Sequence, residues 1–558
     1  MRNHPTLVDK VYELKSRLPD EIFLRQPYGN DWNEFTYEEV VNEALCLVTA
    51  MKNFGLQKGD KIGIYSKNCY HWIVSEIAIM LGGFVMVPYY SNLVGDALKE
   101  VIELSEIKFL FVGKLDEWEQ AEKAFPEDLA ILKFPHYESN AVVTSGISWD
   151  DFLKGAEPDQ ENFRPNPEDI WAIFYTSGTT GVPKGAVMPF SSPANLMMEQ
   201  SKKHNNFNLM DPGKNRFLSY LPLNHIAEQV LHIAGGFYNE GQISFVESLE
   251  SFSKNLTDVQ PSVFLAVPRI WTKFRQGVLA KIPQNKLDTM LKIPIISTLI
   301  KKKIRKSLGL SNTKLVVSGA SALPEDTISW FKKLDIKIQE AYGLTETMGI
   351  VAFDPINDMR SGKTGRRLEE GQMKIDPVTE EILVKNNWMF TSYYKDPILT
   401  KECFAEDGFY KTGDTGELDK DDYLIVKGRV KDTFKTNKGK FIVPIPIEDL
   451  FAGNSLIEMI CLVGLGIPQP MALIKLSDFS NNMKKEDIEH SLLKTLNNVN
   501  DQLQRYQIIH KLICIEEEWS LNNDKLTPTM KIKRNVIHES YKSKYQKWYE
   551  HKDKIMIL

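Results

Sequence analysis

The chain has 558 residues, which exceeds the usual length of one compact domain, so we expect at least two domains. Hydrophobic residues make up 42% and charged residues 25%, a balance that excludes a disordered chain and fits a globular protein with large cores. The formal net charge is -6, and no basic stripe is interleaved with aromatic residues, which argues against a nucleic-acid partner. Small molecules are the expected ligands.

Strand-like apolar runs alternate with helical stretches from the N-terminus to about residue 350, and this alternation predicts a layered α/β architecture. The runs are KIGIY from Lys61, FVMVP from Phe84, FLFVG from Phe109, WAIFY from Trp171, SVFLAV from Ser262 and KLVVSG from Lys314.

Three features predict a cytoplasmic location. The N-terminus has no apolar segment followed by small residues, so no secretory signal is expected. The most membrane-like stretch, residues 72–90, is broken by Glu76 and by Gly82-Gly83, and it predicts a buried helix followed by a strand. The cysteines form no CxxC pair, which argues against both a disulfide framework and a zinc site.

The run YTSGTTGVPKG, residues 175–185, has the composition of a polyphosphate-binding loop. Its glycines allow backbone N–H groups to surround phosphate oxygens, the hydroxyls add donors, and Lys184 adds a positive charge. It is not a Walker loop, because Pro183 and Gly185 stand where glycine and Ser or Thr are needed. Apolar runs on both sides indicate that it joins two strands. A plain Gly/Thr-rich turn is the alternative.

With this loop, the chain resembles the acyl-adenylate-forming superfamily, which includes acyl-CoA synthetases, peptide synthetase adenylation domains and beetle luciferases. Further motifs of that superfamily follow in order: LPLNHIAEQ from Leu221, VVSGAS from Val316, QEAYGLTET from Gln339, the long run from Tyr410, and LTPTMKIKR from Leu526. The resemblance implies a large layered α/β N-terminal domain, residues 1–428, and a small mobile α+β C-terminal domain, residues 429–558. Lys431 would lie at the hinge between them.

The resemblance also implies a nucleotide site. Thr345 would donate to a phosphate, Glu346 would bind Mg²⁺ as the metal ligand, and Tyr342 would stack on adenine, with Gly319 and Ala320 close to the same base. A carboxylate suits a hard cation, although an exposed acid in a Gly-containing turn is the alternative for Glu346. The β and γ phosphates of ATP would be held by Thr176, Ser177, Gly178, Thr179, Thr180 and Lys184.

Asp414 and Arg429 resemble the ribose-binding pair of the superfamily. A carboxylate can accept from both vicinal hydroxyls, and a guanidinium donates in a planar fork. A purely structural ion pair is the alternative. His225 would lie beside the acyl carboxylate and the pantetheine passage, with a hydrogen-bonded core histidine as the alternative. Some long-chain relatives place a gating tryptophan where this chain has Gln229.

The small domain would supply the remaining groups. Lys531 fits the pattern Lys, aliphatic, any residue, Arg, and the resemblance makes it the catalytic lysine that reaches the α-phosphate and the carboxylate. Gly439, in the turn TNKGK, would line the pantetheine channel in a second pose of the domain. A hinge needs a residue that tolerates backbone rotation, which suits the polar Lys431.

Residues 272–306 carry ten Lys or Arg against one acid, Asp288, with apolar residues between them. Peripheral contact with an anionic membrane and a solvated basic face are both open readings. A homodimer is also left open.

The motifs together predict an ATP-dependent long-chain or very-long-chain acyl-CoA synthetase. Its ligands would be a fatty acid, ATP, Mg²⁺ and CoA as the co-substrate. One alternative is an acyl-AMP ligase that loads a carrier protein. The other is a non-catalytic nucleotide- or lipid-binding protein.

Overall fold

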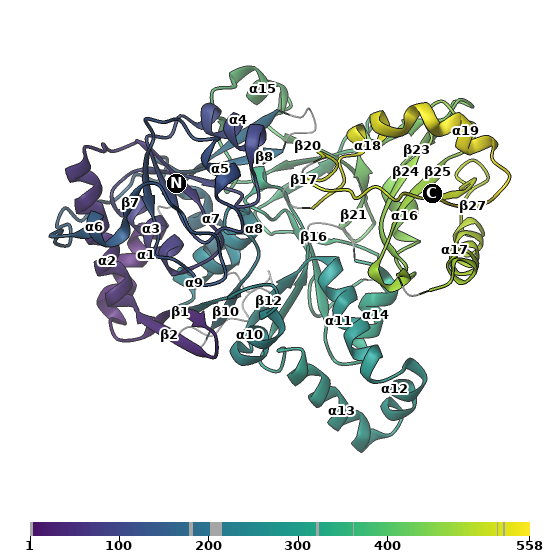
Figure 1. The fold of residues 1–558 in the computed structure, drawn as a ribbon, viewed down its shortest axis with the longest axis horizontal. Helices are drawn as coiled ribbons and strands as arrows, with labels where there is room; N and C mark the ends of the chain where they lie inside the picture. The colour runs from purple at the N-terminus through teal and green to yellow at the C-terminus, as the bar shows by residue number, and fades with distance from the viewer. Residues whose placement is uncertain are drawn as a thin grey trace.

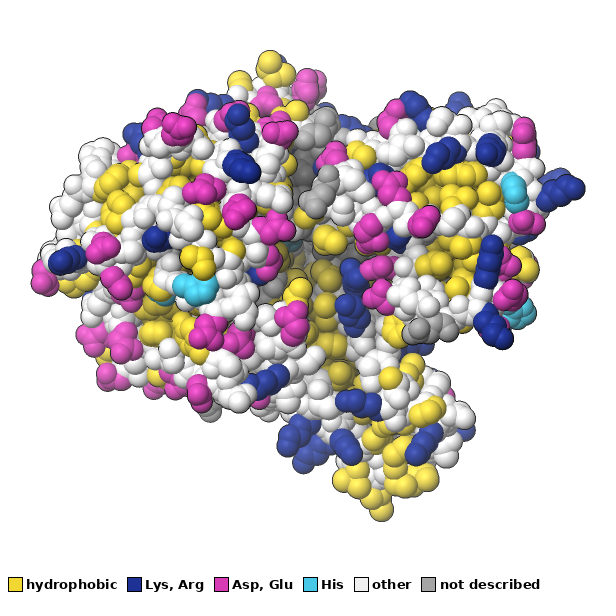
Figure 2. All heavy atoms as spheres, viewed as in Figure 1, with side chains coloured by type: hydrophobic (Ala, Val, Ile, Leu, Met, Phe, Trp, Pro, Cys, Tyr) yellow, Lys and Arg dark blue, Asp and Glu magenta, His cyan; other side chains and the backbone are white. Residues whose placement is uncertain are grey.

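A computed structural model describes residues 4–177, 182–200, 215–319, 323–360, 362–481, 483–521, 523–527 and 530–558. It divides into a large N-terminal part and a smaller C-terminal part that lie side by side (Figure 1). The space-filling view is hollowed between these two parts (Figure 2).

An eight-stranded sheet carries the predicted phosphate loop. Parallel pairing joins the strands from β8 through β4 to β7, whereas β8, β9 and β19 pair antiparallel. The strand order is β19 (Ser392–Tyr393), β9 (Pro183–Pro189), β8 (Ile170–Ser177), β4 (Val85–Tyr89), β3 (Lys61–Tyr65), β5 (Phe109–Val112), β6 (Ala130–Lys133) and β7 (Ile147–Ser148).

A nine-stranded sheet carries most of the other motifs. Its first three strands are parallel and the rest are antiparallel. The order is β12 (Val263–Ala266), β13 (Leu315–Ser318), β14 (Ile338–Tyr342), β15 (Ala352–Phe353), β16 (Gly365–Arg367), β21 (Tyr423–Arg429), β20 (Tyr410–Leu418), β18 (Glu381–Lys385) and β17 (Gln372–Ile375). A third sheet contains β10 (Arg216–Ser219), β11 (Gln242–Phe245), β1 (Ile22–Tyr28) and β2 (Asp31–Thr36).

Helices of the large part surround these sheets (Figure 1). Thr6 and Thr36 begin α1 and α2 with capping boxes, in which the threonine hydroxyl accepts from a backbone N–H and the following acid accepts from the threonine N–H. The helices are α1 (Leu7–Arg17), α2 (Tyr37–Phe54), α3 (Tyr70–Leu81), α4 (Gly95–Ser105), α5 (Glu119–Glu122), α6 (Trp149–Leu153), α7 (Ser191–Gln200), α8 (Ile226–Glu228), the π-helix η1 (Gln229–Ala234), α9 (Gly235–Tyr238), α10 (Phe252–Val259), α11 (Pro268–Lys281), α12 (Gln284–Leu291), α13 (Pro294–Ser307), α14 (Glu325–Lys332), the 3-10 helix η2 (Thr345–Thr347) and α15 (Pro397–Glu402).

The C-terminal part is built on its own small sheet. Strands β24 (Ile457–Val463), β25 (Met471–Leu476), β26 (Leu512–Cys514) and β27 (Ile555–Ile557) form it in that order, and β22 (Phe434–Lys435) pairs with β23 (Phe441–Ile442). Its helices are η3 (Val430–Asp432), α16 (Pro444–Asp449), η4 (Asp478–Ser480), α17 (Lys485–Asn500), α18 (Arg534–Tyr541), η5 (Lys542–Lys544) and α19 (Tyr545–Glu550).

Buried side chains form separate cores in the two parts. Among the described residues, three apolar clusters lie within residues 7–424 and two lie within residues 442–555. All five cysteines are free thiols, and Cys69, Cys461 and Cys514 are buried. The predicted α/β fold with a smaller C-terminal domain is confirmed, as are the six strand runs and the helix and strand within residues 72–90.

No helix in the part of the chain that the structure describes combines the length and the apolar composition needed to cross a membrane.

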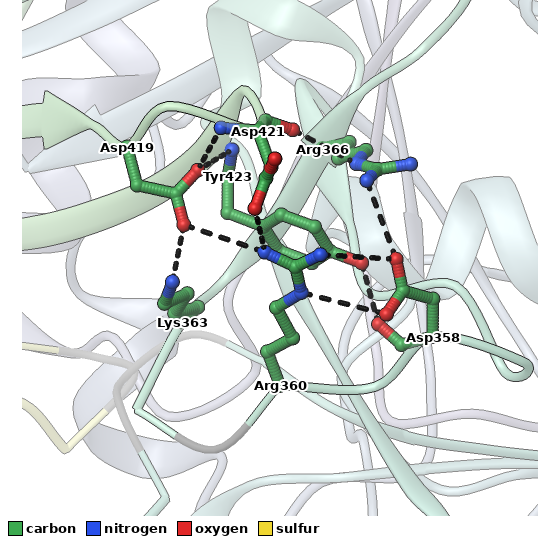
Figure 3. A network of polar contacts seen from close by, with 7 residues as sticks. All are labelled: Asp358, Arg360, Lys363, Arg366, Asp419, Asp421 and Tyr423. Carbon is green, nitrogen blue, oxygen red and sulfur yellow. Dashed lines mark hydrogen bonds and ion pairs between the residues drawn. The ribbon is translucent and has the colours of Figure 1, made fainter.

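A charged network fixes the β20–β21 hairpin to the loop that precedes β16 (Figure 3). Arg360 Nη1 donates to Asp421 Oδ2 at 2.6 Å, and the guanidinium groups of Arg360 and Arg366 lie 4.2 and 4.5 Å from the centre of the buried Tyr423 ring. Stacked guanidinium groups on an aromatic face add cation–π attraction to the ion pairs. The hairpin that this network holds in place also carries Asp414 and Arg429.

Candidate active site

The predicted phosphate loop connects two antiparallel strands, as the sequence indicated. Thr176 pairs with Lys184 and Ser177 with Pro183 across β8 and β9. A Cβ atom at Gly185 would lie 2.9 Å from Ile173 Cγ2, so packing between the strands requires glycine there. The predicted ligands Gly178, Thr179 and Thr180 lie outside the described residues, as do Ala320 and the side chain of Ser177.

The structure brings both Lys184 and Glu346 close to one tyrosine, Tyr393. Tyr393, on β19, donates from its hydroxyl to Glu346 Oε1 at 2.6 Å, and the Lys184 ammonium lies 5.7 Å from the centre of the Tyr393 ring. Burial raises the pKa of Tyr393, so its hydroxyl remains a donor at neutral pH. The sequence analysis did not identify Tyr393, because only the pairing of β19 with β9 brings it to the site.

Glu346 has the chemistry of a magnesium ligand. Glu346 is buried in the 3-10 turn η2, which also contains the half-buried Thr345, and its carboxylate accepts from Tyr393 of β19. No cluster of three metal-ligating side chains occurs among the described residues. Mg²⁺ keeps few protein ligands and takes the rest from phosphates and water, so a single carboxylate beside a phosphate loop fits this ion.

Tyr342, Asp414 and Arg429 form one hydrogen-bonded group. The Tyr342 hydroxyl donates to Asp414 Oδ2 at 2.8 Å, and Arg429 Nε lies 3.2 Å from Asp414 Oδ1. Asp414 and Arg429 face each other as a cross-strand pair of β20 and β21. Burial raises the pKa of Asp414, while Arg429 and Tyr342 oppose this rise. The ion pair expected as the structural alternative is present, and it leaves the half-buried guanidinium accessible to a ligand.

Gly319 follows β13 directly. A Cβ atom there would find its nearest neighbours at 3.6 Å, Leu265 Cδ1, and 3.7 Å, Ala341 O, which are ordinary contacts. Packing within the protein therefore does not require glycine at this position. Its place at the end of a parallel strand is where ligands bind in open α/β sheets.

His225 caps helix α8. Its Nδ1 accepts the backbone N–H of Ala227 at 3.2 Å, which leaves Nε2 to carry the proton of the neutral ring. Burial, with a contribution from the charge of Lys531, lowers the pKa of His225 to about 4. A neutral, half-buried imidazole with a free N–H can donate a hydrogen bond but supplies no charge.

Gln229 is fully buried beside an equally buried acid, Glu76. Its amide donates to Glu76 Oε2 at 3.2 Å and to Leu223 O at 2.8 Å. Burial raises the pKa of Glu76 to about 7, and the bonds from Gln229 and Trp72 oppose the rise. The residue that replaces tryptophan is thus part of a buried polar contact at the start of the π-helix η1, and π-helices are frequent at functional sites.

Lys531 occupies a tight turn of the C-terminal part. Leu526 and Ile532 form a β-bridge around it, Met530 adopts a left-handed conformation with φ of 62°, and the Lys531 N–H donates to Thr527 Oγ1 at 3.0 Å. The side chain contacts solvent, but enough protein surrounds it that desolvation lowers its pKa. The charge of Arg429 lowers this pKa further and that of Asp414 raises it, so Lys531 lies within electrostatic reach of both residues.

Arg534 links the predicted hinge to the small core, a role that the sequence analysis did not assign. Its Nη1 donates to Glu448 Oε1 at 2.6 Å, Nη2 also contacts Glu448, and Nε lies 3.2 Å from Asp432 Oδ2. Asp432 belongs to η3, which also contains the exposed Lys431. The sequence contained one indication of this role, because Arg534 is the arginine that ends the pattern Lys, aliphatic, any residue, Arg, which begins at Lys531.

Gly439 lies in the exposed turn between β22 and β23, with φ of 77°. Its N–H donates to Thr436 O at 2.9 Å, within the same turn. Glycine adopts this left-handed backbone conformation without strain, so the geometry of the turn is sufficient to account for a glycine at position 439.

Comparison with known protein families agrees with this fold and this arrangement. The family model described as "AMP-binding enzyme" matches residues 13–394, and the one described as "AMP-binding enzyme C-terminal domain" matches residues 431–553. The chain belongs to the AMP-binding enzyme family, and the resemblance drawn from its motifs is confirmed.

Among curated proteins, the chain is similar to long-chain acyl-activating enzymes. It is 26% identical to the long-chain-fatty-acid--CoA ligase FadD15 of Mycobacterium bovis, with 98% of this chain and 97% of the relative covered. It is 28% identical to long chain acyl-CoA synthetase 5 of Arabidopsis thaliana, with 91% and 87% covered.

Among solved structures, the fold is similar to the A domain of carboxylic acid reductase from Segniliparus rugosus, determined with AMP and a co-purified carboxylic acid. The TM-score is 0.79 at 19% identity, with 98% of this chain and 94% of that chain covered. The anthranilate CoA ligase AuaEII, in complex with anthranoyl-AMP, gives a TM-score of 0.76 at 19% identity, with 97% and 98% covered.

Proposed function

We propose that this protein is an ATP-dependent long-chain fatty acid–CoA ligase. The observation that carries the proposal is the convergence of charged groups from separate elements: Lys184 and Glu346 meet at Tyr393, and Lys531 lies within electrostatic reach of Asp414 and Arg429. Two substrates that are both anions need such a set of cations before they can react.

The first half-reaction activates the fatty acid. A carboxylate oxygen attacks the α-phosphorus of ATP, the bond to the bridging oxygen breaks, and pyrophosphate leaves to give acyl-AMP. Lys184, with the loop residues 176–180, holds the β and γ phosphates, and Lys531 offsets the charge that builds where the two anions meet. Glu346 would hold Mg²⁺, which would supply further neutralisation of the phosphate charge.

The same half-reaction needs the nucleotide and the acid to be oriented. Tyr342 stacks on adenine, and Asp414 and Arg429 bind the ribose hydroxyls. Thr345 donates to a phosphate. His225, neutral at physiological pH, donates from Nε2 toward the acyl carboxylate or its product.

The second half-reaction transfers the acyl group to CoA. The CoA sulfur attacks the acyl carbonyl carbon, the bond to the AMP oxygen breaks, and AMP leaves. In our proposal the small domain, residues 429–558, rotates about Lys431 against the large domain, residues 1–428, so that the turn at Gly439 lines the pantetheine channel. Separate cores on the two sides of the hinge support such a rotation.

The acyl chain and the location are inferred from weaker observations. The curated relatives that are 24–28% identical carry long-chain names, which supports a long-chain fatty acid as the substrate. Five free thiols support a reducing, cytoplasmic setting.

Pyrophosphate release from the purified protein tests the proposal. ATP and Mg²⁺ are supplied with acetate, octanoate, palmitate, oleate or an aryl acid, each with and without CoA. We expect release with the long chains that rises when CoA is added, together with acyl-CoA as product. Accumulation of acyl-AMP that is indifferent to CoA would instead identify a carrier-loading ligase, and ATP binding without release would identify a non-catalytic protein.

A further inference from the structure

Helices α12 and α13 project from the large part as an arm (Figure 1). One face of α13 is attached to the arm, because Ser297, Ile300 and Ile304 are buried. The opposite face is apolar at its N-terminal end: Ile295 is 77% exposed and Leu299 is 64% exposed. Ile293 and Ile296 are exposed beside them. Figure 2 shows hydrophobic side chains gathered at the end of this arm.

The same outer face becomes basic along the helix. Lys302 and Lys303 follow Leu299 by three and four residues, and Lys306 follows these two lysines by four and three residues. All three lysines are exposed. With a rise of 1.5 Å per residue, Lys302 lies roughly 10 Å along the axis from Ile295. Lys292, also exposed, lies on the other side of the apolar residues. Within residues 272–306, the structure therefore places exposed apolar residues and exposed lysines on one surface.

Three acids on the arm or on the elements next to it have other partners. Asp335 pairs with Lys301 at 3.1 Å, Asp326 pairs with Arg275 at 2.7 Å, and Asp288 accepts from Gln284. In the described ranges of the chain, no ion pair is recorded for Lys292, Lys302, Lys303 or Lys306. Within the described ranges, these four lysines thus have no directly paired acid, and the face keeps a positive charge.

We propose that the arm tip, defined as Ile293, Ile295, Ile296 and Leu299 with Lys292, Lys302, Lys303 and Lys306, docks the protein on an anionic lipid bilayer. The aliphatic side chains enter the interface and the lysines contact the headgroups, the arrangement that surface-bound amphipathic helices use. A second copy of the chain would bring lysines against lysines, so charge complementarity favours the anionic surface. The proposal does not depend on the chemistry of the nucleotide site.

Vesicle co-sedimentation of the full chain tests this inference. The probes are vesicles of phosphatidylcholine alone and vesicles with roughly a third of phosphatidylserine. We expect binding only to the anionic vesicles, weakened by added salt because surface charges are screened. Each lysine near the surface contributes about fivefold in affinity, so the variant Lys302→Gln/Lys303→Gln/Lys306→Gln should bind on the order of a hundredfold more weakly.

Two further variants make the result specific. Ile295→Ser/Leu299→Ser removes the apolar contact while keeping the lysines, and it should also lose binding. Lys484→Gln/Lys485→Gln/Lys494→Gln removes the same number of exposed charges from the small domain, and it should bind like the wild type. All the substituted side chains are exposed, so each variant should keep the thermal unfolding temperature of the wild type.

Three outcomes would overturn the proposal. The first is equal binding by the wild type and the arm lysine variant, and the second is absence of binding to anionic vesicles. The third is a wild type that binds no vesicles but forms a dimer in solution, and a variant Ile295→Ser/Leu299→Ser that is monomeric. The arm tip would then be a contact between two copies of the chain.

Discussion

Lys531 is the residue on which the proposed chemistry depends most. Desolvation and the guanidinium of Arg429 both destabilise its charged form, and Asp414 partly restores it. Lys531 keeps contact with solvent, but the surrounding protein displaces part of its water, so its attraction to an incoming anion is stronger than that of a fully solvated lysine.

Replacing Lys531 by Ala should lower the rate of adenylation by about 100-fold or more, since loss of one preorganised charge-stabilising group costs about that much. The affinity for ATP should change little. Single-turnover formation of acyl-AMP and equilibrium ATP binding measure the two effects. Lys533→Ala is the matched control, because Lys533 pairs with Asp524 in the same turn. Full adenylation with a selective loss of thioester formation would contradict this role.

The buried acid Glu76 predicts a pH dependence of stability. It ionises near its ordinary pKa of 4.5 in the unfolded chain but only near about 7 when folded, so folding becomes less favourable as the pH rises through this window. The loss amounts to about 3 kcal/mol at most. In Glu76→Gln this contribution is absent, so its unfolding temperature should fall less than that of the wild type between pH 5 and 8.

Calorimetry across this pH range makes the comparison. Glu340, Asp354 and Asp449, whose pKa values burial also raises to about 7, are present in both proteins and cancel in the difference. If the unfolding temperatures of the wild type and Glu76→Gln changed equally with pH, Glu76 would not titrate in this window.

At the scale of elements, the strands and the loop between them were predictable because local sequence determines them. Apolar runs bounded by polar residues predicted β3, β4, β5, β8, β12 and β13, and the apolar runs on both sides of the loop predicted that it joins two strands. Tyr393 was not predictable, because its distance from Glu346 depends on β19 pairing with β9, a contact between residues about two hundred positions apart. Pairing between strands so far apart in the sequence is established only when the whole sheet folds.

The link between α18 and the hinge predicts a stability effect. Arg534→Met would leave Glu448, which is buried, without its partner, and breaking a buried pair costs about 3–5 kcal/mol. The unfolding temperature of the small domain should fall by several degrees. Adding Glu448→Gln should recover part of this loss, because the uncompensated charge is then removed. A single variant as stable as the wild type would mean that the pair contributes nothing.

For the whole molecule, the decisive property is that both the large and the small part contribute residues to the proposed nucleotide site. Lys531 and Arg534 belong to the C-terminal part, whereas Lys184, Glu346 and Asp414 belong to the N-terminal part. The order of motifs predicted the two parts, but the distance between Lys531 and Asp414 depends on how they are placed. No local pattern in the sequence predicts how the large and small parts are placed relative to one another.

The proposed hinge predicts a separation of the two half-reactions. In Lys431→Pro the ring fixes φ near −65° and removes the N–H, so rotation of the small domain should be hindered. Adenylation should stay within a few-fold of the wild type, while transfer to CoA should slow by about tenfold or more. Acyl-AMP formed in a single turnover and then chased with CoA measures both steps. Lys431→Ala, which keeps backbone freedom, should behave nearly as the wild type; equal slowing in both variants would argue against a hinge here.

The five free thiols have a chemical consequence for an enzyme whose product is a thioester. Burial raises the pKa of each of them, to about 11 at Cys403 and about 12 at Cys461 and Cys514. Thiolates are the nucleophiles, so at neutral pH the protein presents almost none to a reactive acyl anhydride formed within it. Burial therefore disfavours transfer of the acyl group to a cysteine of the chain in place of the sulfur of CoA.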